Sequence, residues 1–247
     1  MTDEPSAADE IMDGVYRALC THGYAGVTMQ DIADECSKSK SLLHYHYDTK
    51  EDLLVAFFDH ILVDFEEKVA ETADEPPLVR LATFLDRFVF DPSESERESF
   101  HIALLELRSQ GPFNDRIREQ LDRSDRLLRE TLVDILSEGI EAGQIRDVDP
   151  EELAALIVAA IDGARTRQIT LGEDVLGDDT YTCVTSRGVR RRIVEPVLTE
   201  GATLPPAEEP AADAAATKGE AGREDDAGED SEEPPAAPER ADGDWTE

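Results

Sequence analysis

A short run of polar side chains near the N-terminus carries the groups that contact phosphates and base edges. Lysine, serine, histidine and tyrosine all offer hydrogen-bond donors to such groups. The run comprises Lys38, Ser39, Lys40, Ser41, His44, Tyr45 and His46. Residues 37–50 hold three lysines and one aspartate, a local excess of positive charge in a chain whose formal charge is −34. This reversal of sign favours a nucleic-acid contact surface.

Short helical patterns must position this run. A first helix presents Ile11, Val15 and Leu19 on one face and ends at Gly23. Thr28 is a good N-cap for a second short helix, which carries Asp31 at a capping-box position.

A polar break over residues 37–41 leads into a third short helix that reaches Tyr47. Two short helices joined by a tight turn are typical of a helix-turn-helix, whose last helix enters the major groove. Asp48 and Thr49 then cap a long fourth helix.

Longer amphipathic patterns with a helical period fill the middle of the chain. Further helices are predicted near residues 77–88, 100–107, 114–142, 150–172 and 179–199. No run has the two-residue period of a strand, so the sequence predicts an all-α protein. Three zones follow: a helix-turn-helix DNA-binding domain over 8–50, a helical effector-binding and dimerisation domain over 51–200, and a disordered acidic tail over 202–247.

The acidic charge is not confined to the tail. Residues 202–247 carry 15 acidic and 3 basic side chains, which leaves a large negative charge on the remainder of the chain. Dense surface carboxylates keep a protein hydrated when salt screens their repulsion. We therefore expect a halophilic origin, the alternative being an acidic mesophilic protein with an acidic tail.

The cysteines and the N-terminus indicate a cytoplasmic protein. Cys20, Cys36 and Cys183 are an odd number without a C-x-x-C pair, which fits a reducing compartment. Cys20 and Cys36 lie on predicted apolar faces and are expected to be buried structural thiols. No secretory signal and no membrane span is predicted.

The stretch from Val27 to Leu54 resembles the signature of TetR-family regulators. In that family a T-x-x-x-I-A segment leads through a turn to a short aromatic-rich recognition helix, and K-x-x-L opens the fourth helix. The matching positions are Thr28, Ile32, Ala33, Ser39, Leu43, Tyr45, His46, Lys50 and Leu53.

The resemblance implies the roles of individual residues. The DNA-binding residues would be Thr28, Lys38, Ser39, Lys40, Ser41, Leu42, His44, Tyr45, His46 and Lys50. Three positions depart from the family pattern: Ser37 stands for the usual turn glycine, Lys38 for an apolar residue and His44 for an aromatic one. We expect Ser37 to adopt a positive φ. The operator sequence cannot be carried over.

The resemblance also implies a homodimer that reads a palindromic operator on double-stranded DNA. The helices over 150–172 and 179–199 would pair with their mates in a four-helix bundle. A small-molecule effector would bind in an apolar pocket and release the DNA, with the signal carried by the fourth helix. Candidate pocket residues are Phe84, Phe88, His101, Leu105 and Ile157. Repression is the expected sign of regulation.

Other interpretations of single residues stay open. His44 and His46 are two apart, a poor spacing for metal ligands on a helix, so no metal site and no cofactor is expected. His101 is expected to be a core histidine. Arg108, Arg165 and Gln168 either hold an anionic effector or face solvent or a dimer interface.

The residues 190–192 form an arginine run that is expected to be a solvated helix face. Asp162 alone is too little for an active site, and Gly163 is expected to let two helices approach closely.

No catalytic constellation appears, so the chain is not expected to be an enzyme. Two alternative classes are carried along: a helical protein-interaction adaptor, and a small-molecule-binding enzyme without DNA binding. The short polar third helix with its lysines argues against the adaptor, and only the sizeable core domain supports the enzyme.

Overall fold

The computed structural model describes residues 6–90, 95–171, 176 and 179–207. The described residues form helices and no strand, so the all-α prediction is confirmed. The helices are α1 (Ala7–Gly26), α2 (Met29–Glu35), α3 (Lys40–His46), α4 (Lys50–Glu71), α5 (Pro77–Asp86), α6 (Ser95–Arg108), α7 (Asp115–Glu141), α8 (Pro150–Thr170) and α9 (Tyr181–Val189). Among these residues, no helix is both long and apolar enough to cross a membrane.

Reciprocal capping begins three of the first four helices. The side chains of Ser6, Thr28 and Thr49 each accept a hydrogen bond from the backbone N–H three residues on. The aspartate at that position in turn accepts a hydrogen bond from the backbone N–H of the capping residue. The Thr28 and Thr49 caps are therefore confirmed as local features. They fix where α2 and α4 begin, and hence the length of chain left for α3.

Helices α1 to α4 share one core. Val15, Ile32, Leu43 and Leu53 are fully buried in it, one from each helix. Gly14 brings α1 onto α2, since a Cβ there would lie 2.6 Å from the Cβ of Cys36. The first four helices are thus packed as one unit, although α4 continues well beyond it.

Gly23 breaks the first helix as predicted. Its φ of 66° and ψ of 173° are non-helical, and one more helical turn follows to Gly26. Only glycine adopts such a backbone without strain.

The turn between α2 and α3 holds the positive φ that the sequence predicted. Ser37 has φ 52°, and no other non-glycine residue in the described ranges has a positive φ. A Cβ in this region costs about 1–2 kcal/mol. The turn of the helix-turn-helix therefore contains a strained residue.

Replacing Ser37 with glycine is expected to stabilise the protein. The relief of strain outweighs the added chain entropy of glycine, for a net gain of about 0.5–1 kcal/mol. Thermal unfolding would show this as a rise of a few degrees in Tm. Ser41→Gly is the matched control: Ser41 lies inside α3, so the same change there should lower the Tm.

A second core joins the helices of the C-terminal half. Leu81, Leu132, Leu136 and Ile157 are fully buried where α5, α7 and α8 meet, and α9 packs on α8. Gly143, at φ 69°, ends the turn after α7 as predicted.

The last predicted helix, 179–199, is not uniform. Regular α-helix stops at Val189, and a π-helical turn (Arg190–Val194) and a 3-10 turn (Glu195–Val197) follow. Pro196 lacks an N–H and its ring clashes with the carbonyl four residues earlier, so the α-helix cannot continue. The N–H of Glu195 donates instead to the carbonyl of Arg190.

The arginine run was interpreted wrongly at its first residue. Arg190 is buried and its guanidinium donates to Asp86 and to the carbonyls of Ala82 and Pro205, whereas Arg191 and Arg192 are exposed. Arg190 lies one helical turn after the buried Ser186 and directly follows α9, so its side chain continues the buried face of that helix toward the end of α5.

The first residues of the predicted tail lie against the core. Leu204 is buried with the residues of α5 and α8, and the carbonyl of Pro205 accepts a bond from Arg190. The remaining tail residues, 208–247, lie outside the described residues.

Candidate DNA-binding surface and regulatory core

Helix α3 is anchored by one buried side chain and exposes the polar ones. Leu43 is fully buried, while Tyr45 is 82% exposed. Also exposed are Lys40, Ser41, His44 and His46. Ser39 caps α3 by accepting from the N–H of Leu42, and Leu42 is half-buried. The exposed residues form a continuous donor surface on a helix of the size that enters a major groove.

Two of the predicted DNA-binding lysines are engaged within the protein. Lys38 forms an ion pair with Glu10 of α1. The Lys50 ammonium donates to the carbonyl of Tyr24 at 3.1 Å and lies 5.2 Å from the centre of the Tyr24 ring. Both lysines tie α1 to its neighbours, a tertiary role that the sequence did not indicate.

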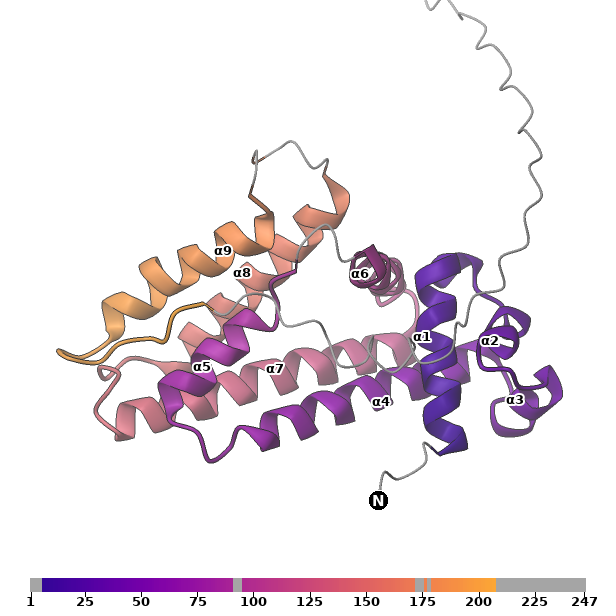
Figure 1. The fold of residues 1–247 in the computed structure, drawn as a ribbon, viewed down its shortest axis with the longest axis horizontal. Coiled ribbons are helices and arrows are strands. Elements are labelled where there is room, and N and C mark those ends of the chain that lie inside the picture. Colours follow the sequence, from indigo (N-terminus) through magenta and orange to yellow (C-terminus); the bar gives the residue numbers. More distant parts are fainter. Residues whose placement is uncertain (1–5, 91–94, 172–175, 177–178, 208–247) are drawn as a thin grey trace, which may run out of the picture. The chain divides into compact units, whose positions relative to one another are not determined.

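Helix α6 packs against α1 and also contacts α8, so it links the N-terminal core to the C-terminal half (Figure 1). The Phe100 ring lies 4.8 Å from the Tyr16 ring, and Ala103 is buried in the N-terminal core. Glu106 accepts from the N–H of Ala25 at 3.2 Å, beside Gly23 with its positive φ. The sequence predicted a link between the halves through the fourth helix alone and did not indicate this role of α6.

The thiol of Cys20 is held at the same contact. Its Sγ lies 3.5 Å from the carbonyl oxygen of Glu96, and burial raises its pKa to about 12, with the Glu96 carboxylate adding to the shift. Such a thiol stays protonated and unreactive at neutral pH. Cys36 is buried, as the sequence predicted.

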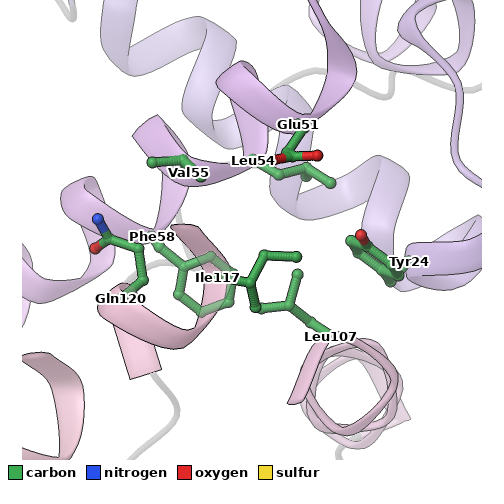
Figure 2. Close-up of a pocket in the computed structure, with 8 residues that line it drawn as sticks. All are labelled: Tyr24, Glu51, Leu54, Val55, Phe58, Leu107, Ile117 and Gln120. Carbon is green, nitrogen blue, oxygen red and sulfur yellow. The ribbon is translucent and has the colours of Figure 1, made fainter. Parts of the chain in front are cut away.

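A small pocket lies where α1, α4, α6 and α7 meet (Figure 2). Its cavity volume is only about 10 Å³. Leu54, Phe58, Leu107 and Ile117 converge on it, and Glu51 and Gln120 lie at its edge. Ligand sites are usually larger, from about 300 Å³ upward. None of the five predicted effector-pocket residues lines this pocket.

Those five residues lie between α5, α6 and α8. Phe84 and Ile157 are buried in the C-terminal core, and Phe88 packs against it just after α5. His101 and Leu105 are half-buried on α6, and the His101 ring lies 4.9 Å from that of Phe90.

An ion-paired cluster joins α6 to α8 next to His101. Asp162 of α8 accepts from Arg108 of α6, and from Arg165 one turn further along α8 at 3.1 Å. Asp162, which the sequence showed without a partner, thus has two cationic partners. Gln168 instead bonds the Phe90 carbonyl and Thr182, which tie α8 to α9.

Burial keeps His101 neutral, and three arginines add to the effect. Burial lowers its pKa from 6.5 to about 3, and the charges of Arg165, Arg97 and Arg108 add to the shift. The side chain is half-buried, whereas the sequence predicted a core position.

The free energy of unfolding should fall on acidification through His101. Below pH 6.5 the unfolded chain binds a proton that folded His101 does not bind until about pH 3. Stability is therefore lost as pH falls through that window, by up to about 1.4 kcal/mol per unit. Urea denaturation at pH 7 and pH 5 should show a smaller loss for His101→Gln than for the wild type. Equal losses would contradict the assignment.

Comparisons with known proteins agree with this arrangement. A family described as "Bacterial regulatory proteins, tetR family" matches residues 11–57, and "BetI-type transcriptional repressor, C-terminal" matches residues 77–194. The solved structure of a TetR transcription regulator from Haloarcula marismortui is 38% identical, with a TM-score of 0.67, over 78% of this chain and 98% of that chain.

Two more distant proteins are also similar. The HTH-type transcriptional repressor AcnR of Corynebacterium glutamicum is 27% identical over 170 residues, which cover 68% of this chain and 85% of AcnR. A regulator from Saccharomonospora viridis in complex with choline shares the fold, with 24% identity and a TM-score of 0.62 over 78% of this chain and 98% of that chain.

The helix-turn-helix with its exposed α3 and the helical core behind it define a DNA-binding transcriptional regulator rather than an enzyme. The chain belongs to the TetR family.

Proposed function

We propose that this protein is a homodimeric repressor that binds a palindromic operator and is released by a small-molecule effector. The exposed donor surface of α3, anchored by buried Leu43, is the observation that carries the DNA-binding part. The name of the similar AcnR, a transcriptional repressor, supports repression as the sign of regulation.

The outer surface of α8 and α9 supports the homodimer. Leu156 is 52% exposed on α8 and Val184 is 37% exposed on α9. Ala155, Ala159 and Gly163 follow at four-residue intervals on an exposed side of α8, and a Cβ on Gly163 would meet nothing in the described chain. Small side chains at this spacing let two helices approach closely. A second copy would bury this surface in a four-helix bundle.

Effector release requires a path from the C-terminal core to α3. Helix α4 runs through both cores, and α6 bonds α1 through Glu106. An effector that favours one position of α6 would change how the two DNA-binding units of the dimer are spaced. Half-sites one helical turn apart, about 34–36 Å, tolerate little change in that spacing.

Fluorescence anisotropy in KCl would test the proposal. The probe is the duplex from immediately upstream of the gene, and a shuffled duplex is the control. Tight binding to the first duplex alone, with two protomers per site by light scattering, is the expected result. Leu156→Glu should give monomers that bind weakly. Wild-type monomers would refute the dimer, and equal affinity for both duplexes would refute this operator.

A halophilic protein should also bind DNA with little dependence on salt. Each DNA phosphate that the protein neutralises contributes about −0.9 to the slope of log binding constant against log salt concentration. This electrostatic contribution to affinity is largely lost in concentrated salt. With a formal charge of −34, the protein should rely on base contacts and shape instead. Affinity measured from about 0.5 to 3 M KCl should change weakly or even rise. A steep loss would contradict both the salt prediction and the halophilic origin.

A further inference from the structure

We propose that the effector is a carboxylate with an apolar chain, and that its carboxylate binds Arg108 and Arg165 between α6 and α8. The inference deepens the proposed function, because it gives the effector a chemical class and a place. It stands on the charges and contacts of the described residues around Asp162.

The cluster already binds one carboxylate and has charge to hold another. Two guanidinium groups share the single side chain of Asp162: Arg108 bonds both of its oxygens, and Arg165 bonds one. Arg165 is only 17% exposed and Arg108 38% exposed. An excess positive charge in a half-buried place is costly unless an anion offsets it.

Donors remain available on both arginines. A guanidinium carries five N–H donors in a planar fork that matches a carboxylate. Within the described ranges, one nitrogen of each group bonds Asp162, and neither group has a nitrogen that is both buried and without a partner. The other nitrogens are therefore open to an incoming acceptor.

The neighbouring His101 does not offset the positive charge of the two arginines. Its ring is held neutral beside Arg108 and Arg165. Burial is the main cause, and the charges of Arg165, Arg97 and Arg108 add to it. With two guanidinium groups on one carboxylate, this place would favour an anion and disfavour a quaternary ammonium ion.

Aromatic rings beside the arginines select for an apolar chain. The Arg165 guanidinium lies 5.2 Å from the centre of the Phe88 ring, and the Phe90 ring lies 4.9 Å from that of His101. Leu105 lies one helical turn after His101 on α6 and is half-buried. The Phe90 ring is already fully buried, so a straight apolar chain would lie on the half-buried Phe88 and Leu105 side chains and remove them further from water.

The site connects directly to the DNA-binding unit. Arg108 lies two residues beyond Glu106, which accepts from Ala25 of α1. An anion that draws Arg108 from Asp162 would loosen α6 from α8 and change the position of Glu106. The same helix would thus bind the effector and move the DNA-binding unit.

Calorimetry with sodium octanoate would test the site without DNA. At constant KCl, octanoate is expected to bind and raise the Tm, while 1-octanol and octyltrimethylammonium should not. Arg108→Gln and Arg165→Gln should each weaken octanoate binding about 10- to 100-fold, the loss of a charged hydrogen bond. Asp162→Asn removes the competing carboxylate and should strengthen binding several-fold.

Matched variants separate the site from folding. Arg129→Gln breaks an exposed ion pair with Asp125 on α7 and should leave octanoate binding unchanged. If Arg108→Gln fails to fold by circular dichroism, Arg108→Lys keeps the charge without the planar fork and should bind octanoate weakly.

Either of two results would overturn the proposal: no octanoate binding by the folded wild type, or binding that the arginine variants do not weaken. DNA binding is measured separately by anisotropy. Loss of the octanoate site with intact operator binding would refute the effector class and leave the regulator standing.

Discussion

Replacing Lys40 and Tyr45 together with alanine is expected to lower operator affinity about 1,000-fold while the protein stays folded. Both side chains are exposed on α3. The Tyr45 ring packs edge-on against the neighbouring His46 ring, with 5.0 Å between the ring centres. Each contact to DNA contributes about 1 kcal/mol or more, and a dimer makes each contact twice. Four lost contacts amount to about 4 kcal/mol, or about three orders of magnitude.

Anisotropy with the upstream duplex, at one fixed KCl concentration, would measure this loss. Lys68→Ala is the control: it removes the same charge from the last turn of α4, outside the helix-turn-helix, and should leave affinity within a factor of two or so. An unchanged Tm would show that the double variant is folded. Affinity that falls less than tenfold would mean that α3 does not read the operator.

The local features of the DNA-binding unit could be predicted from the sequence because neighbouring residues determine them. The Thr28 cap depends on Asp31 three residues on, and the Gly23 break and the positive φ of Ser37 depend on the backbone at those residues. Capping and turn geometry need no distant partner.

The contacts between the halves could not be predicted in this way. Glu106 reaches Ala25 across 81 residues, and Arg108 reaches Asp162 across 54. The helical period says which face of a helix is apolar, but not which helix covers it. For the same reason Lys38 and Lys50, predicted only as DNA contacts, also bond Glu10 and Tyr24.

The burial of Arg190 is the clearest case. Three adjacent arginines suggest a solvated face, yet Arg190 lies one helical turn after the buried Ser186 and is itself buried, while Arg191 and Arg192 are exposed. The helical period can suggest which arginine faces inward, but the carboxylate and carbonyls that it meets there depend on how α5 and the chain after α9 pack.

Arg190→Ala should therefore destabilise the protein by about 3–5 kcal/mol, the cost of removing one partner of a buried ion pair. The side chains of Arg190 and Asp86 are only 7% and 13% exposed, and Nη2 of Arg190 lies 2.7 Å from Oδ1 of Asp86. Two backbone carbonyls also accept hydrogen bonds from the guanidinium. Urea denaturation in KCl would measure the loss. Arg187→Ala removes an exposed pair with Asp179 and should cost less than about 1 kcal/mol.

The double variant Arg190→Met with Asp86→Leu separates charge burial from packing. If the loss in Arg190→Ala comes from breaking the buried ion pair with Asp86, replacing both groups with apolar side chains should restore most of the stability. The carbonyls of Ala82 and Pro205 would still lack their donor, so a deficit of about 1–2 kcal/mol should remain. A double variant as unstable as Arg190→Ala would show that the arginine acts by holding the chain after α9 onto α5, through those carbonyls, and that the ion pair adds little.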